Sequence, residues 1–140
     1  MEVTSISGGI IIDHVPSGTA LKVLEYLHID PSVTKIAVIM NADSKRFGRK
    51  DIIKIEGDCP IDFNVLGLVA RQSTVDIVRD GKISEKLSPT LPENVTDVIS
   101  CANPRCITTS ERGIKQRFHL TRREDKAEYR CDYCDEEACL

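Results

Sequence analysis

The sequence lacks an apolar run long enough to cross a bilayer, an excess of charge of one sign, internal repeats and low-complexity segments. Its 19 lysines and arginines nearly balance 22 aspartates and glutamates, so that the formal net charge is −3. A chain without a basic field is poorly suited to nucleic acid, and one without a long apolar segment does not span a membrane. We therefore expect neither a nucleic acid nor a membrane as its partner.

A secretory signal peptide is also missing from the start of the chain. Met1-Glu-Val-Thr-Ser has no basic segment, and no long apolar run follows it. Six cysteines in a secreted chain of this length would suggest disulfides, but without a signal peptide a reduced compartment fits better. We expect a cytoplasmic protein.

Catalytic motifs are absent from the sequence as well. The three histidines, His14, His28 and His119, belong to no recognisable nucleophile, acid-base or open-metal motif. We identify no catalytic residue and expect a protein that is not itself an enzyme.

The strongest chemical signal that is present is a set of four cysteines in two short-spaced pairs. Cys101 and Cys106 form one pair, and Cys131 and Cys134 form the other. Two such pairs on separate turns can converge as four thiolates around one tetrahedral Zn²⁺. A redox role is the alternative, but the second pair follows a polar, charged stretch and not a thioredoxin-like βαβ unit. A closed four-thiolate site has no open coordination position, so we expect one structural zinc ion.

Two cysteines remain outside these pairs. Cys139 lies five positions after Cys134 and is either a substitute ligand or, more simply, a bystander. Cys59 precedes Pro60 and is expected to be a small, partly buried apolar residue.

The segment that carries the cysteine pairs is poor in large apolar residues. A domain of about forty residues rarely buries enough surface to fold without help, so the metal would supply the missing free energy. The clustering of cysteines predicts two domains, 1–90 and 98–140, with a semi-rigid, proline-containing linker at 91–97.

The N-terminal domain alternates strand and helix patterns. Short β-branched runs predict five strands, at 9–15, 35–40, 51–56, 74–78 and 82–86. One helix is expected to begin after a Ser17 cap and to stop at Pro31, and a second to begin at 58–60, while 41–48 is read as a polar turn and Asp80-Gly81 as a hairpin turn. The order predicts a split βαβ arrangement. The fold class is therefore α+β: a ferredoxin-like sandwich of an antiparallel sheet and two helices, followed by a small β-rich zinc domain.

Two lysines of the third predicted strand fall on one face of the sheet. Strand periodicity places Lys50 and Lys54 on one side with Ile52, and Asp51 and Ile53 on the other. Two ammonium groups on one face can hold a polyphosphate, whereas the plainer interpretation is a pair of solvated lysines. The residues alone leave both open.

Several segments together resemble the regulatory chain of aspartate carbamoyltransferase, in the right order and over nearly the whole chain. These segments are 9–16 (Gly-Ile-Ile-Ile-Asp-His-Val-Pro), 48–56 (Gly-Arg-Lys-Asp-Ile-Ile-Lys-Ile-Glu), 91–93, 103–108 (Asn-Pro-Arg-Cys-Ile-Thr) and 131–134. A generic zinc ribbon would not bring the Asp-His and Arg-Lys-Asp segments with it.

The resemblance implies a non-catalytic subunit in pyrimidine biosynthesis with two tasks. Its N-terminal domain would bind the effectors CTP, UTP and ATP and pair two regulatory chains into a homodimer. Its zinc domain, with the four paired cysteines as ligands, would dock on a catalytic chain. The family's holoenzyme has two catalytic trimers bridged by three regulatory dimers.

The resemblance also implies the residues of the effector site, which include the acid Asp13 and the histidine His14. Lys54 matches the lysine that contacts the nucleotide, Lys86 matches the one that approaches the phosphates, and Lys50 matches a basic residue nearby. The remaining positions match apolar residues, or their backbone groups, around base and ribose: Ile6, Ile11, Val78 and Ile83.

Two positions depart from the best-known members of the family. Asp76 replaces an asparagine beside the phosphates, and a carboxylate there would repel a bare triphosphate unless Mg²⁺ bridges the two. Gly81 replaces a bulkier residue near the hairpin.

A nucleic-acid-binding zinc ribbon is the alternative of a different class. Basic residues gather between the cysteine pairs: Arg112, Lys115, Arg117, Arg122, Arg123, Lys126 and Arg130. Acidic residues interleave with them or follow at once, which is more typical of a solvated or protein-docking surface.

Overall fold

The structure is a computed structural model that describes residues 5–122 and 127–139. The chain divides into two compact units, of which the first ends at Thr90 and the second begins at Leu91. None of the helices in these described ranges is long and apolar enough to cross a membrane.

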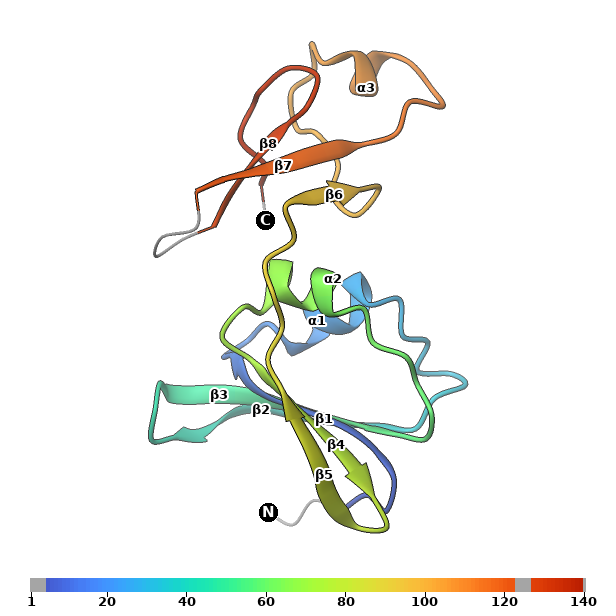
Figure 1. The fold of residues 1–140 in the computed structure, drawn as a ribbon, viewed down its shortest axis with the longest axis vertical. Helices are drawn as coiled ribbons and strands as arrows, with labels where there is room; N and C mark the ends of the chain where they lie inside the picture. The colour runs from blue at the N-terminus through green and yellow to red at the C-terminus, as the bar shows by residue number, and fades with distance from the viewer. Residues whose placement is uncertain (1–4, 123–126, 140) are drawn as a thin grey trace. The chain divides into compact units, whose positions relative to one another are not determined.

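The first unit is a five-stranded antiparallel sheet with two helices on one face (Figure 1). Its strands are β1 (Gly9–Pro16), β2 (Ile36–Ser44), β3 (Gly48–Glu56), β4 (Thr74–Arg79) and β5 (Lys82–Leu87), and its helices are α1 (Ala20–Tyr26) and α2 (Phe63–Val69). The strand order β2-β3-β1-β4-β5 places β3 between β1 and β2, which is the predicted split βαβ arrangement with a fifth strand at the edge. The predicted fold class is therefore confirmed.

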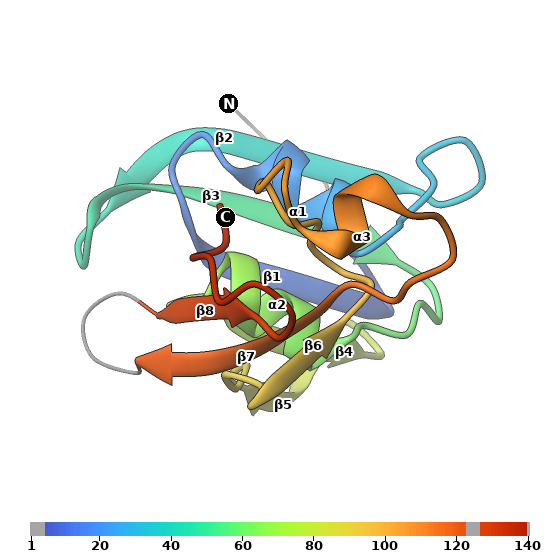
Figure 2. The same cartoon turned by 90° about the horizontal axis from the view of Figure 1, so that it is seen from above.

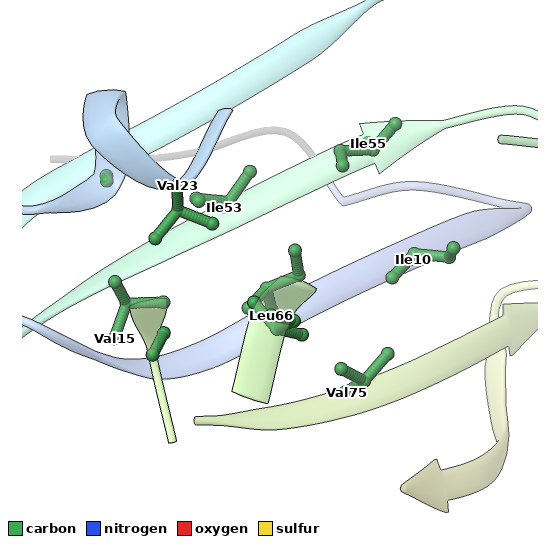
Figure 3. Close-up of a cluster of buried hydrophobic side chains, with 10 residues drawn as sticks. Ile10, Val15, Val23, Ile53, Ile55, Leu66 and Val75 are labelled. Carbon is green, nitrogen blue, oxygen red and sulfur yellow. The ribbon is translucent and has the colours of Figure 1, made fainter. Parts of the chain in front are cut away.

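Side chains alternate between the two faces of the sheet, and one face forms the core. Along β3, Asp51, Ile53 and Ile55 are buried, whereas Lys50, Ile52 and Lys54 are half-buried on the opposite face. Figure 3 shows the core, in which side chains of β1, β3 and β4 pack against Val23 of α1 and Leu66 of α2. The residues labelled there are Ile10, Val15, Val23, Ile53, Ile55, Leu66 and Val75. The face opposite the helices is called the open face below.

The β2–β3 hairpin is longer than the sequence predicts. The expected polar turn at 41–48 is mostly strand, because Ala42 pairs with Lys50 and Asp43 pairs with Arg49. An Arg49–Asp43 ion pair of 2.7 Å joins the two strands in this extension. Backbone hydrogen bonds between strands do not require apolar side chains. The hydrophobic pattern of β2 therefore ends before its backbone pairing with β3 does.

Helix α1 is capped from another strand, which corrects the expectation of a Ser17 cap. Its N-cap residue, Thr19, makes no side-chain cap bond. The fully buried carboxylate of Asp51 on β3 instead accepts N–H bonds from Gly18 (2.8 Å), Ala20 (3.0 Å) and Asn41 (2.8 Å). Asp51 therefore satisfies donors at the helix start and at the bend of β2 together.

Helix α2 begins later than predicted, with Asp62 as its N-cap accepting N–H bonds from Asn64 and Val65. Inside this helix, Gly67 lies against the backbone of Thr90. A Cβ built on Gly67 would stand 2.0 Å from the Thr90 carbonyl oxygen, so only glycine allows the chain to pass there.

The second unit is a three-stranded antiparallel sheet in the order β6-β7-β8. Its elements are β6 (Asn94–Thr96), β7 (Arg117–Arg122), β8 (Glu128–Cys131) and the short helix α3 (Ile107–Ser110), which lies in the connection between β6 and β7 (Figure 2). Its buried apolar side chains are few, chiefly Val95, Ile99, Phe118 and Tyr129. The segment 91–97, expected to be a linker, contains β6, because backbone pairing with β7 recruits Asn94–Thr96 into this sheet.

Candidate functional site

Four thiols of the second unit converge on one point. The Sγ atoms of Cys101, Cys106, Cys131 and Cys134 all lie within 4.8 Å of one another. The Cys101–Cys134 pair is 3.5 Å apart and the Cys106–Cys131 pair is 3.8 Å apart. Zinc–sulfur bonds of about 2.3 Å in a tetrahedron require sulfur atoms roughly 3.8 Å apart. These thiols therefore fit a zinc-type ion, and their separations are too long for disulfide bonds.

Two tight turns bring the thiols together. In the first, the Cys106 N–H donates to the Asn103 carbonyl at 3.1 Å, and Cys106 then serves as the N-cap residue of α3. In the second, the chain leaves β8 at Cys131, and the Asp135 N–H donates back to the Cys131 carbonyl at 2.9 Å. The second turn folds its cysteine pair locally, whereas the first positions Cys106 but not Cys101, which precedes that turn.

The thiols differ in how readily they lose a proton. Removal from water raises the pKa of Cys101 to about 12 and also raises the pKa of Cys131. The pKa of Cys106 is lowered to about 7, chiefly because the Thr108 hydroxyl lies 3.0 Å from its Sγ. Metal binding must therefore displace protons from Cys101 and Cys131 near neutral pH.

The two remaining cysteines lie outside this group. Cys139 is exposed, and among the described residues it does not belong to the four-thiol cluster. Cys59 is half-buried and packs against the core of the first unit, as the sequence predicts.

A row of charged residues crosses the open face of the first unit. Strand register places Lys54 of β3 opposite Ile11 of β1, Ile11 opposite Asp76 of β4, and Asp76 opposite Lys86 of β5. Residues directly opposite on neighbouring strands point to the same face. Four predicted site residues from four strands therefore share one row. Within residues 5–122 and 127–139, neither lysine of this row makes an ion pair.

A second cluster lies beside this row at a bulge in β1. The Lys50 ammonium is 2.9 Å from the Asp13 carboxylate, and both side chains are largely buried. The next residue, His14, has a positive φ of 57°, and its Nδ1 lies 3.1 Å from the Thr74 hydroxyl. The His14 ring also meets the Phe47 ring edge-on, with centroids 6.1 Å apart. The Asp-His pair is thus held by neighbours on β3, on β4 and in the β2–β3 turn.

The other predicted positions lie near the edge of the same sheet. Val78 is buried and pairs with Ile83 of β5, which is about half exposed. Ile6 is half-buried before β1. Gly81 has a φ of 76° in the predicted hairpin turn, and a Cβ there would meet nothing within 4 Å. The position has room for a larger side chain but a backbone that favours glycine.

Comparison with known proteins matches both units to one family. Residues 1–90 match the family described as aspartate carbamoyltransferase regulatory chain, allosteric domain, and residues 93–139 match the same chain's metal binding domain. A regulatory chain from Bifidobacterium longum (strain NCC 2705) is 71% identical over 140 residues, which is the whole of both chains. A regulatory chain from Clostridium tetani (strain Massachusetts / E88) is 48% identical over 137 residues, covering 97% of this chain and 94% of that one.

The chain belongs to the family of aspartate carbamoyltransferase regulatory chains. The predicted family is thereby confirmed. These relatives are named as regulatory and not catalytic chains, in agreement with the prediction that the protein is not itself an enzyme. The first unit is the allosteric domain of such a regulatory chain, and the second, with its four thiols, is the metal-binding domain.

Three features of this regulatory chain escaped sequence reasoning. Asp51 is a buried cap and not simply a residue of the core face. Gln116 hydrogen-bonds the backbone of a cysteine ligand, a contact that no motif indicates. A cavity of about 640 Å³ lies where the start of β1 and the end of β4 meet the β3–α2 connection, lined by Ile10, Cys59, Phe63 and Ile77 among others. It contains none of the site lysines.

The basic segment between the cysteine pairs is mixed in charge in the structure as well. Arg123 and Lys126 lie outside the described residues. The Arg130 guanidinium is 3.2 Å from the Glu128 carboxylate, and His119 Nδ1 is 2.6 Å from Asp132. These pairs reduce the positive field that a phosphate track would need.

Proposed function

We propose that this chain is a cytoplasmic, non-catalytic subunit that binds a nucleotide on its open face and controls an aspartate carbamoyltransferase catalytic chain. The observation that carries the proposal is the row in which Lys54, Ile11, Asp76 and Lys86 face one side of the sheet. The two lysines, which have no ion-pair partner in the part of the chain that the structure describes, flank an apolar residue and a carboxylate, and this suits a ligand with both anionic and apolar parts.

The residues of the open face then have distinct tasks. The ammonium groups of Lys54 and Lys86 contact the phosphates and ribose. The side chains of Ile6, Ile11 and Ile83, with the backbone of the buried Val78, surround the base and ribose. Lys50 is partly neutralised by Asp13 in the free protein. The pair therefore orients the His14 bulge and contributes less charge than a free lysine would.

Asp76 makes the binding of a nucleoside triphosphate depend on Mg²⁺. Its carboxylate lies opposite Lys86 in the ladder, in the path of the phosphates. A Mg²⁺ ion bound with a nucleoside triphosphate converts this repulsion into attraction, because a divalent cation dominates the local charge. We therefore propose that CTP, UTP or ATP binds more tightly with Mg²⁺ than without it.

The second unit couples the nucleotide site to the partner. Its four cysteines hold Zn²⁺, which neutralises the thiolates and stabilises the turns that carry them. The zinc-loaded unit docks on the catalytic chain, and the first unit pairs with a second regulatory chain. Two catalytic trimers and three regulatory dimers form the proposed assembly. Nucleotide acts by favouring one arrangement of this assembly over another.

A binding titration tests the site directly. Nucleoside triphosphate is titrated calorimetrically into the zinc-loaded chain, with and without Mg²⁺, for the chain itself and for Lys54→Ala and Lys86→Ala. Charged hydrogen bonds contribute about 1.5–3 kcal/mol each, so each substitution should weaken binding by about tenfold or more. Lys82→Ala, which removes an exposed lysine from the same strand as Lys86, is the matched control. Equal losses in all three variants would show diffuse attraction and no defined site.

A kinetic assay tests the regulatory role separately. Carbamoyl-aspartate formation by the cognate catalytic trimer is measured across an aspartate titration, with and without the zinc-loaded chain and nucleotide. The chain should be inactive alone, change the trimer's aspartate curve, and change it further with nucleotide. An unaltered curve in the presence of folded, zinc-loaded chain would overturn the partner assignment.

A further inference from the structure

The connection between β6 and α3 leaves the first cysteine of the metal centre without regular secondary structure to hold it. Cys101 lies in the irregular segment after β6, and its backbone N–H is bonded by a side chain. The acceptor is Oε1 of Gln116, at 3.1 Å. The position of this ligand thus depends on a residue fifteen positions further along the chain.

The other end of the same amide reaches the second ligand. Gln116 Nε2 donates to the carbonyl of Thr108 at 3.3 Å. Thr108 is buried, and its hydroxyl lies 3.0 Å from Cys106 Sγ. Only one orientation of the amide satisfies both an N–H donor and a carbonyl acceptor, so the side chain is fixed by its partners.

The backbone of Gln116 is itself held in place. Its N–H donates to the Asp97 carboxylate at 2.8 Å, and its carbonyl accepts from the Asp97 N–H at 2.7 Å. The next residue, Arg117, begins β7, and its carbonyl accepts from the N–H of Asp132 at 2.9 Å, within the second cysteine turn. Gln116 therefore stands where the sheet meets both ligand-bearing turns.

We propose that Gln116 is a positioning residue for the metal centre. In the folded unit it holds Cys101 and Cys106 in the positions that a tetrahedral ion requires. Groups that orient metal ligands typically change metal affinity by about 10–100-fold when they are removed. This role rests on the metal-binding function of the second unit and is independent of nucleotide binding in the first.

Three variants of the full chain separate positioning from general stability. Gln116→Met keeps the length of the side chain and removes both hydrogen bonds. Gln116→Glu keeps an acceptor for the Cys101 N–H and loses the donor to Thr108. Thr121→Val is the matched control, because it removes a side-chain bond between the strand that follows Gln116, β7, and Glu128 of β8, away from the four clustered cysteines.

Two measurements are made on each zinc-loaded chain. One is the rate of zinc release to an excess of a coloured chelator, and the other is the hydrogen exchange rate of the Cys101 amide by NMR. We expect Gln116→Met to release zinc about tenfold faster or more and to lose protection at the Cys101 amide. Gln116→Glu should retain that protection and release zinc at an intermediate rate, while Thr121→Val should change neither quantity.

Two results would overturn the proposal. The first is a Gln116→Met chain that loses protection at the Cys101 amide but releases zinc at the original rate. The second is a Thr121→Val chain that releases zinc as fast as Gln116→Met, which would attribute the effect to loss of stability anywhere in the unit. If Gln116→Met does not fold, Gln116→Glu is the variant that tests the proposal. An unchanged rate of zinc release from Gln116→Glu would then contradict the positioning role.

Discussion

Substitution of Asp51 by asparagine tests whether a buried carboxylate organises the first unit. Asp51 is fully buried and accepts three backbone N–H bonds of 2.8–3.0 Å, from Gly18, Ala20 and Asn41. Hydrogen bonds to a charged group contribute about 1.5–3 kcal/mol each. The asparagine amide keeps one oxygen, points an N–H group at a former donor, and has no charge to strengthen the remaining bonds.

The expected loss follows from these bonds. One broken bond and two weakened ones, offset by the smaller cost of burying a neutral group, give about 2–4 kcal/mol. At roughly 4–8 °C per kcal/mol for a unit of this size, the midpoint of thermal unfolding should fall by about 8–32 °C. Since domains are stable by only about 5–15 kcal/mol, this loss is a large part of the total.

The assay is urea unfolding of the zinc-saturated chain, followed by the NMR signals of Val23 on α1 and Leu66 on α2, both of which lie in the core. These signals report on the first unit alone. Asp43→Asn is the control, because Asp43 is an exposed acid whose ion pair with Arg49 lies on the surface. The reasoning is refuted if both variants unfold within about 0.5 kcal/mol of the unsubstituted chain, the range typical of surface substitutions.

Two further predictions concern a glycine and the metal. Gly67→Ala places a Cβ 2.0 Å from the Thr90 carbonyl oxygen and should destabilise the first unit by about 1–3 kcal/mol in the same urea assay. Gly8→Ala places a Cβ at an ordinary contact distance of 3.9 Å from the Val78 carbonyl oxygen and should be nearly neutral. Equal effects would show that the Thr90 segment simply moves away. Burial raises the pKa of Cys101 to about 12 and raises that of Cys131, so both thiols are protonated near neutral pH without metal. These two thiols alone should therefore make zinc affinity fall by roughly a hundredfold per unit of falling pH, one factor of ten per displaced proton, in chelator competition between pH 8 and pH 7. A pH-independent affinity would contradict these protonation states.

Sequence patterns predicted the layers of the fold because burial alternates clearly in β3 and in the first half of β1. They failed where polar backbone pairing extends an element, as in the β2–β3 hairpin, and where a distant side chain replaces a local cap, as Asp51 does for α1. Both failures have one cause: propensity is local, whereas a hydrogen-bond acceptor can come from any strand that packs nearby.

The candidate sites were predictable to different degrees for a related reason. The four cysteines lie in two short turns, so their spacing alone indicates a metal ligand set. The open-face row joins residues of four strands, and strand periodicity alone assigns each only to a face. The alignment of Lys54 with Lys86 depends on strand order and register, which the tertiary fold sets. Gln116 has no signal in the sequence at all, because an isolated glutamine before a strand is equally compatible with solvent.

The two units are stabilised by different means, and this difference bears on how the chain would work as a coupler. The first unit has a continuous aliphatic core that includes Ile12, Ile53 and Leu66, all fully buried, so its fold does not depend on a metal. The second buries few large apolar side chains and surrounds its four thiols with turns. A unit that depends on an ion for its fold holds its docking surface rigid only when loaded. A nucleotide signal from the first unit would therefore reach a partner only through a metal-bound second unit, even though the open face, where we propose that nucleotide binds, would persist without the metal.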